Sequence, residues 1–157
     1  MLKKIFLIVL LLFISSCGYV AKYGQNNSSS DSLVDFSISK INFLGDRKIN
    51  IKVREKLNRY ILQTKSRQIA LDINSVSDTK VTARDVAGDP TGFNTIVRIF
   101  VIVDLGNGVK RDLRFEENFK YNNDSDKYSL ERYESELKRN MAEIICDKLL
   151  IRLSNIK

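Results

Sequence analysis

Two cysteines and the absence of histidine limit the chemistry that this sequence can perform. Among its 157 residues, Cys17 and Cys146 lie far apart, so neither belongs to a CxxC site for zinc or redox chemistry. Without histidine, there is no histidine-activated nucleophile and no metal bound by imidazole. The acidic residues show no motif with a fixed carboxylate spacing. We therefore expect no enzymatic activity and no metal, while a disulfide between the two cysteines is formally open at this point.

Cys17 follows a segment with the features of a secretory signal. Two lysines precede an unbroken apolar run over residues 5–14, and two serines separate that run from the cysteine. Ten apolar residues are too few for a membrane span, which takes roughly 20. The ending Ile-Ser-Ser-Cys (14–17) resembles the bacterial lipobox, whose thiol receives a diacylglycerol before cleavage. We expect residues 1–16 to be a signal peptide and Cys17 to be lipidated; the alternative is a buried thiol after a chance apolar segment.

The residues after Cys17 predict how the mature chain is held. Each buried methylene contributes about 0.8 kcal/mol and stable anchoring takes more than one chain, which a triacylated cysteine provides. Lipoproteins retained in the inner membrane usually carry aspartate next to the cysteine; here the residue is Gly18, which implies the outer membrane. The polar stretch over residues 24–32 cannot join a core and spans roughly 15–18 Å as a coil. We expect residues 17–32 to be an acylated N-terminus and flexible tether.

The charge of the chain favours a polyanionic partner. The formal net charge is +7, and removal of the leader with its two lysines lowers it to +5. This suits nucleic acid, an anionic lipid surface or a phosphorylated glycolipid. The basic face of a helix over residues 47–65 is either solvated or in contact with such a partner. Four basic residues near strand ends are candidates for binding phosphorylated sugar, since arginine can bind phosphate bidentately: Lys80, Arg84, Lys110 and Arg111. Solvated charges are the alternative there too.

The periodicity of apolar residues predicts six elements that position these groups. The four strands cover 34–43, with a β-bulge near Ser39 and Lys40, then 69–84, 95–105 and 109–121. One helix is capped by Asp46, and a second of about 28 residues starts at Asp126. A loop over 85–94 and a hairpin turn at 106–108 connect the last three strands. The order β-α-β-β-β-α predicts an α+β two-layer sandwich, in which two helices cover one face of a four-stranded, mostly antiparallel sheet. Residues 33–157 would form this single domain.

Burial follows from the same pattern. The strand over 95–105 is apolar on both faces, so we expect both to be buried except near Arg98 and the strand to be central. Phe115, Phe119 and Tyr121 share one phase of the next strand and are predicted to lie in the core. Cys146 lies beside the apolar face of the last helix and is expected to act as a small hydrophobe.

The whole plan resembles the LptE family of lipopolysaccharide-assembly lipoproteins. Several short motifs carry the resemblance, in order along the chain: Cys17-Gly18-Tyr19 with Tyr23-Gly24, a strand running into Asp46-Arg47 and a basic helix, Phe-Glu-Glu-Asn-Phe-Lys-Tyr over 115–121, Asp-Lys-Tyr-Ser over 126–129, then Tyr133 and a long amphipathic helix. Val-Ala-Lys at 20–22 departs from the Arg-Pro-Leu usual in the family.

The resemblance implies a function. Members of the family plug a large outer-membrane β-barrel, LptD, help it to assemble, and help to deliver lipopolysaccharide to the outer leaflet. They are not enzymes, need no cofactor and do not bind nucleic acid. The mature chain would then be lipid-anchored at the periplasmic face of the outer membrane. The alternative is a generic envelope lipoprotein that serves as an accessory subunit of a transporter or another envelope complex.

Overall fold

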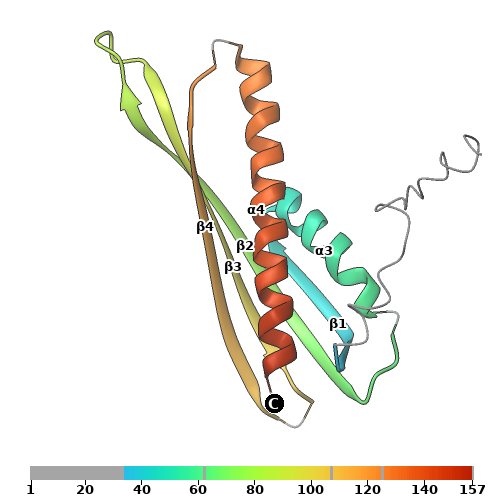
Figure 1. The fold of residues 1–157 in the computed structure, drawn as a ribbon. Coiled ribbons are helices and arrows are strands. Elements are labelled where there is room, and N and C mark those ends of the chain that lie inside the picture. Colours follow the sequence, from blue (N-terminus) through green and yellow to red (C-terminus); the bar gives the residue numbers. More distant parts are fainter. Residues whose placement is uncertain (1–33, 62, 107, 125, 157) are drawn as a thin grey trace, which may run out of the picture. The chain divides into compact units, whose positions relative to one another are not determined.

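The computed structural model describes residues 34–61, 63–106, 108–124 and 126–156. Its elements are β1 (Phe36–Gly45), α3 (Arg47–Ile61), β2 (Arg67–Arg84), β3 (Pro90–Asp104), β4 (Lys110–Asn122) and α4 (Lys127–Asn155) (Figure 1). This is the order that the sequence predicts. The predictions for the signal peptide, for Cys17 and for the tether lie outside the described residues.

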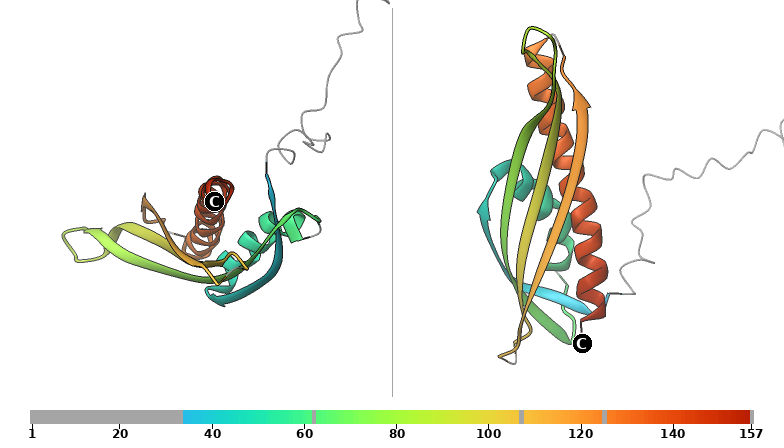
Figure 2. Two further views of the ribbon diagram at one scale, coloured as in Figure 1. Left: turned by 90° about the horizontal axis from the view of Figure 1, so that it is seen from below. Right: turned by 90° about the vertical axis from the view of Figure 1, so that its left-hand side faces the viewer.

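The four strands form one mixed sheet in the order β1-β2-β3-β4. β1 runs parallel to β2 across the α3 connection, and the two following pairs are antiparallel hairpins. Both helices lie on the same, concave side of the curved sheet (Figure 2). The predicted α+β two-layer fold is confirmed.

The core lies between the helices and one face of the two interior strands. Within residues 69–73 of β2 and 97–103 of β3, every second residue points to the helices and is no more than 2% exposed: Ile69, Leu71, Ile73, Val97, Ile99, Val101 and Val103. The opposite face has no such cover, and Ile102 is 42% exposed. β3 is therefore interior, as predicted, but the expectation that both its faces are buried was wrong, because both helices pack on one side.

The turn from β1 into α3 is fixed by side chains of the neighbouring strand. The predicted bulge is present as a register shift between Ile38 and Lys40. Asp46 caps the helix, since its Oδ1 accepts from the backbone N–H of Lys48 at 2.9 Å and of Ile49 at 3.3 Å. Ser77 donates to the other oxygen at 2.7 Å. Partial burial opposes ionisation of this carboxyl, but these hydrogen bonds outweigh it and lower its pKa.

The β2–β3 hairpin has a shorter turn than the sequence suggests. β3 starts at Pro90, so only the first half of the predicted loop over 85–94 is a turn. Proline is tolerated at the first position of a strand, where no ladder donor is required. Asp85 closes the turn by accepting the backbone N–H of Ala87 and of Asp89, at 2.9 and 2.8 Å. Proline and glycine usually interrupt strands, but Pro90 and Gly92 both lie within β3.

Capping at both ends stabilises α4. Asp126 accepts from the backbone N–H of Tyr128 and Ser129 at the first turn. At the other end Arg67 donates to the carbonyl oxygens of Leu153, at 2.8 Å, and of Ile156. A cation there also complements the negative end of the helix dipole. The helix spans 29 residues, about 43 Å at 1.5 Å per residue.

Candidate binding surface

The four basic residues predicted to bind phosphorylated sugar do not form one cluster. Lys80 lies opposite Asn94 on β3, near the β2–β3 turn. Lys110 lies opposite Asp104, at the β3–β4 turn. These positions on β3 are ten residues apart, about 33 Å in a strand, so one pair of charges occupies each end of the sheet. Whether either pair binds glycolipid stays a prediction.

The two pairs also differ in their local contacts. Lys80 lies 3.7 Å from the carboxylate of Asp78. Arg84 donates to the carbonyl oxygen of Gly88 at 2.7 Å and so supports its own hairpin turn. Lys110 and Arg111 are exposed at the start of β4. Arg111 lies opposite Val103, on the sheet face that the helices cover.

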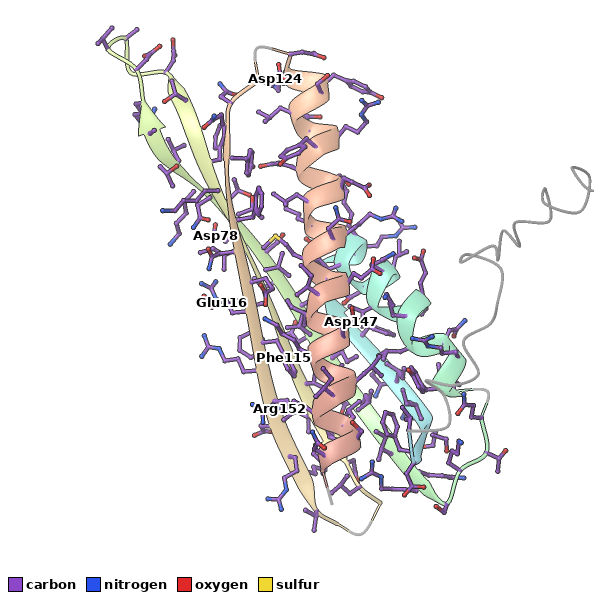
Figure 3. All side chains as sticks on the ribbon, in the orientation of Figure 1. Asp78, Phe115, Glu116, Asp124, Asp147 and Arg152 are labelled. Atoms are coloured by element: carbon purple, nitrogen blue, oxygen red, sulfur yellow. The ribbon has the colours of Figure 1, made fainter. Side chains whose placement is uncertain are left out.

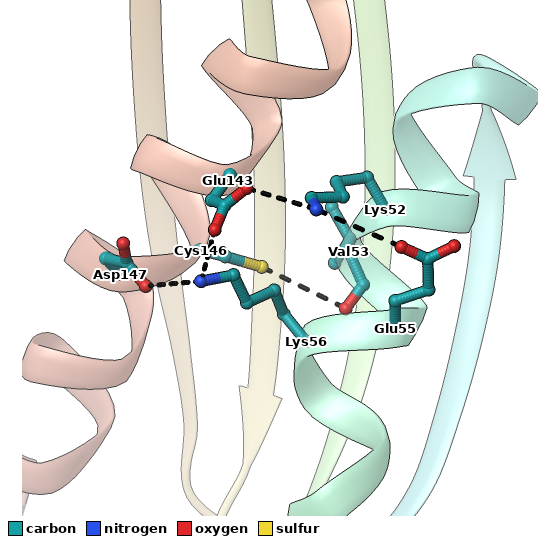
Figure 4. Close-up of polar contacts among 7 residues, drawn as sticks. All are labelled: Lys52, Val53, Glu55, Lys56, Glu143, Cys146 and Asp147. Atoms are coloured by element: carbon teal, nitrogen blue, oxygen red, sulfur yellow. Dashed lines mark hydrogen bonds and ion pairs between the residues drawn. The ribbon is translucent and has the colours of Figure 1, made fainter. Parts of the chain in front are cut away.

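Two lysines of the basic helix α3 hold the helices together instead of facing a partner. Lys52 contacts Glu143 on α4 at 3.1 Å, and Lys56 contacts the same carboxylate at 2.6 Å (Figure 4). Lys56 also lies 3.5 Å from Asp147. The hydrogen bond from Lys56 lowers the pKa of Glu143. Partial burial opposes the charged form of Lys56, but its acidic partners raise its pKa. The sequence predicts that this helix face is either solvated or in contact with a polyanionic partner. Neither applies to Lys52 and Lys56, because both pair with Glu143 on α4.

Cys146 is a packing residue, as predicted. Its side chain is fully buried, and the thiol points to the backbone carbonyl of Val53 on α3 at 4.0 Å (Figure 4). Burial raises its pKa to about 12, so the thiolate is not formed at neutral pH. No group of three metal-binding side chains is present within the described residues. Neither described helix is long and apolar enough to cross a membrane.

A groove runs between the edge strand β4 and the helix α4. Its middle part is lined by Phe119, Tyr133, Leu137, Met141 and Ile144, among others, and encloses about 270 Å³. A hollow of about 630 Å³ shares Tyr133 and Glu136 with this part, and a separate hollow of about 500 Å³ lies between the same two elements toward the end of α4. Phe119 is 45% exposed, and Tyr133 and Ile144 are each 47% exposed. The prediction that Phe119 belongs to the core was wrong, because α4 does not close over this part of the edge strand.

The ends of the groove carry opposite charges. Arg114, Lys148 and Arg152 line the hollow near the end of α4, with Asp112 as its one acidic residue. Asp124 and Glu136 line the other hollow, with Arg132 as its one basic residue. In Figure 3, Asp124 and Arg152 mark these two ends, and Phe115 lies between them. Lys148 and Glu117 form an ion pair from α4 to β4 between the middle and the basic hollow.

A buried polar chain supports the acidic end. The Thr79 and Thr95 hydroxyls lie 2.7 Å apart, the Tyr121 hydroxyl lies 3.3 Å from that of Thr95, and it donates to Glu134 on α4. Burial raises the pKa of Tyr121 to about 12, and the hydrogen bond to Glu134 adds to the shift. The phenol thus remains a donor that ties α4 to the sheet.

The fold is shared with known lipoproteins. The crystal structure of rare lipoprotein B from Shewanella oneidensis matches with a TM-score of 0.59 at 14% identity, over 74% of this chain and 94% of that one. A minor lipoprotein from Acinetobacter baumannii matches with a TM-score of 0.55 at 11% identity, over 74% of this chain and 91% of that one. No protein-family model and no curated sequence matches the chain. At these identities the likeness establishes the fold and no more.

The apolar residues of α4 indicate the groove, although in the sequence they are interpreted only as core residues. The apolar residues of α4 form a stripe wider than one buried face needs. Leu137, Met141 and Ile145 are buried, while Ile144 and Ile151 at the border of the stripe are exposed. Apolar side chains on the border of such a stripe indicate either a wider core or an open groove, and only the distance between α4 and β4 decides between these.

Proposed function

We propose that this chain is an outer-membrane lipoprotein, anchored through Cys17, that plugs and helps assemble an LptD-type β-barrel from its periplasmic face and assists lipopolysaccharide delivery to the outer leaflet. The observation that carries the proposal is the β-α-β-β-β-α domain, whose fold rare lipoprotein B shares. The leader that ends in Ile-Ser-Ser-Cys supports the anchor.

The surface of the domain fits a scaffold that is surrounded by a partner. Apolar side chains are exposed both in the groove and on the uncovered face of the sheet, where Leu44 and Val76 accompany Ile102. Contiguous apolar surface of this kind marks protein interfaces more often than isolated residues do. A domain with such surface on two sides would be covered by the wall of a barrel.

Charge supports the glycolipid part of the proposal. The mature chain would carry +5, and two pairs of basic residues sit at opposite ends of the sheet. Binding of lipopolysaccharide vesicles to the domain of residues 33–157 should weaken with salt, since the Debye length falls from about 10 Å at 0.1 M to about 3 Å at 1 M. We expect reversal of Lys80 with Arg84, or of Lys110 with Arg111, to weaken it further. Reversal of the exposed Lys40 and Arg139 is the matched control.

One observation favours a second candidate function. Each end of the sheet carries only two of the predicted glycolipid-binding charges, and Arg84 is already bound to its own turn. A generic accessory lipoprotein, which binds an envelope complex but no glycolipid, needs no such cluster. Absence of salt-dependent binding to lipopolysaccharide at 0.05 M salt, together with a stable protein partner other than a barrel, would favour it.

The anchor is tested by Cys17→Ala. The precursor should then escape cleavage by the lipoprotein peptidase and keep its leader, which the mass of the full-length protein reports. Processing and membrane fractionation like those of the wild type would contradict lipidation at Cys17. The barrel function is tested by depleting the chain from its cells. The amount of assembled LptD-type barrel should fall, while that of an unrelated outer-membrane barrel should be unchanged.

A further inference from the structure

We propose that the groove between β4 and α4 receives an extended segment of the partner protein, which adds to the edge of β4 as a fifth strand. The inference rests on the proposed function, because it names how the partner is held. Four side chains expose apolar surface in the groove and are called the groove residues below: Phe119, Tyr133, Ile144 and Ile151.

The core of the domain is incomplete on the side of β4. Val101 and Ile99 of β3 face the helices and are almost fully buried, whereas Leu113 and Phe115, which lie opposite them on β4, are only half-buried. Phe119 faces the same side, since it lies opposite the buried Thr95. Its ring is nevertheless half exposed. One more element placed beyond β4 would complete the layer.

The backbone of β4 selects a polypeptide as this element. β4 pairs with β3 alone among the described strands, so its outer edge offers backbone groups for another ladder. Exposed edges of this kind are templates for β-strand addition, in which backbone hydrogen bonds give affinity and alternate side chains fill pockets. A lipid chain could cover the groove residues but has no donors and acceptors for the strand edge.

The charges define what such a segment contains. Its side chains facing the groove alternate with those facing away and are apolar in the middle, opposite Phe119 and Ile144. Arg152 calls for an acidic residue at one end. Arg114 stacks on Phe100 on the other face of the sheet, and Lys148 is already paired with Glu117. Asp124 and Glu136 call for a basic residue at the other. From Leu113 to Tyr121 the strand spans about 30 Å, so a segment of eight to ten residues, roughly, covers the groove.

Photo-crosslinking in the intact lipoprotein tests where the partner lies. A benzophenone amino acid replaces Ile144 in the groove or, as the matched control, Ile102 on the opposite face of the sheet, which has a similar exposed fraction. Irradiation of cells should give an adduct with the LptD-type barrel from position 144, mapped by mass spectrometry to one extended segment. Position 102 faces the barrel wall in the proposed function and should give no adduct with that segment. An adduct with lipopolysaccharide, with a second copy of this chain, or with the barrel from position 102 alone would overturn the proposal.

Charge substitution tests the same surface through affinity. In the full-length protein, Ile144→Glu or Ile151→Glu should lower the amount of co-purified barrel at least about tenfold, because a charge is buried against an apolar strand. Thr64→Glu, at an exposed position between α3 and β2 that lies outside both apolar surfaces, is the control and should change it less than about twofold. Both groove positions are exposed, so circular dichroism should show a folded chain. If both groove variants retain the barrel, the groove proposal fails and the proposed function stands. If the wild-type chain retains no barrel, both fail.

Discussion

Gly45 should be the glycine whose substitution by alanine destabilises the domain most. Its φ is +90°, and a Cβ at this position would lie 1.9 Å from the carbonyl oxygen of Ser75. Ser75 belongs to an interior strand and is almost fully buried, so its backbone cannot retreat. The same oxygen accepts the N–H of Asp46 at 2.9 Å, and Asp46 caps α3. One methyl group therefore displaces a hydrogen bond and a helix cap together.

The expected loss follows from these contacts. A left-handed conformation costs alanine about 1–2 kcal/mol. Loss of the Asp46–Ser75 hydrogen bond adds about 1 kcal/mol, and loss of the cap adds about 1 kcal/mol. Gly45→Ala should thus lower the free energy of unfolding by about 3–4 kcal/mol, a large part of the 5–15 kcal/mol typical of a domain.

Gly88 provides a matched control. Its φ is also +90°, but a Cβ there meets nothing within 4 Å. Gly88→Ala should therefore cost only the conformational part, about 1–2 kcal/mol. Urea unfolding of the domain of residues 33–157, followed by circular dichroism, measures both variants. Equal losses in the two variants would refute the role assigned to the contact between Gly45 and Ser75.

Three further predictions concern the core, the end of α4 and the ion pairs between the helices. Val101→Asp buries an unpaired carboxylate in β3, which costs several kcal/mol, so the domain should fail to unfold cooperatively; an unchanged melting temperature would show that Val101 is not in the core. Arg67→Met keeps the packing stem but removes the donors to Leu153 and Ile156, so it should lower the free energy of unfolding by about 2 kcal/mol. As a control, Lys120→Met on exposed β4 should change the free energy of unfolding by less than about 0.5 kcal/mol. Similar losses for the two variants in urea unfolding would contradict the capping role of Arg67. Because the folded-state pKa of Glu143 is lowered, its stabilising contribution is complete above the ordinary glutamate value of about 4.3 and is lost as the pH falls through the folded-state value. Glu143→Gln should therefore flatten the fall of stability with pH below the ordinary glutamate value, and an identical pH profile would contradict it.

Local patterns in the sequence were sufficient to predict most of the fold. Alternation and helical periodicity depend on which face of an element is buried, so the order of elements, the bulge after Ile38 and the cap at Asp46 could all be predicted. The side of the sheet that the helices cover could not, because Ile102 and Val101 are equally apolar and only tertiary packing distinguishes them. The ion pairs of Lys52 and Lys56 could not be predicted either, because Glu143 lies on a helix far away in sequence.

The candidate site was predicted less well, for a topological reason. Lys80 and Lys110 each lie near a turn, and the local pattern around each indicates only a charge at the end of a strand. Successive hairpin turns lie at opposite ends of the strand they share, here β3. The antiparallel order predicted from the same sequence was enough to separate the two pairs. The groove needed the distance between β4 and α4, which no local pattern contains.

Purification of the full-length lipoprotein from its own membranes in a mild detergent tests the central claim most directly. The chain should elute with a large outer-membrane β-barrel in a ratio of about one to one, and the complex should persist at 1 M salt, because apolar groove contacts are not screened. Recovery of the lipoprotein alone, or with a different envelope complex, would contradict the barrel function and leave the accessory role in its place.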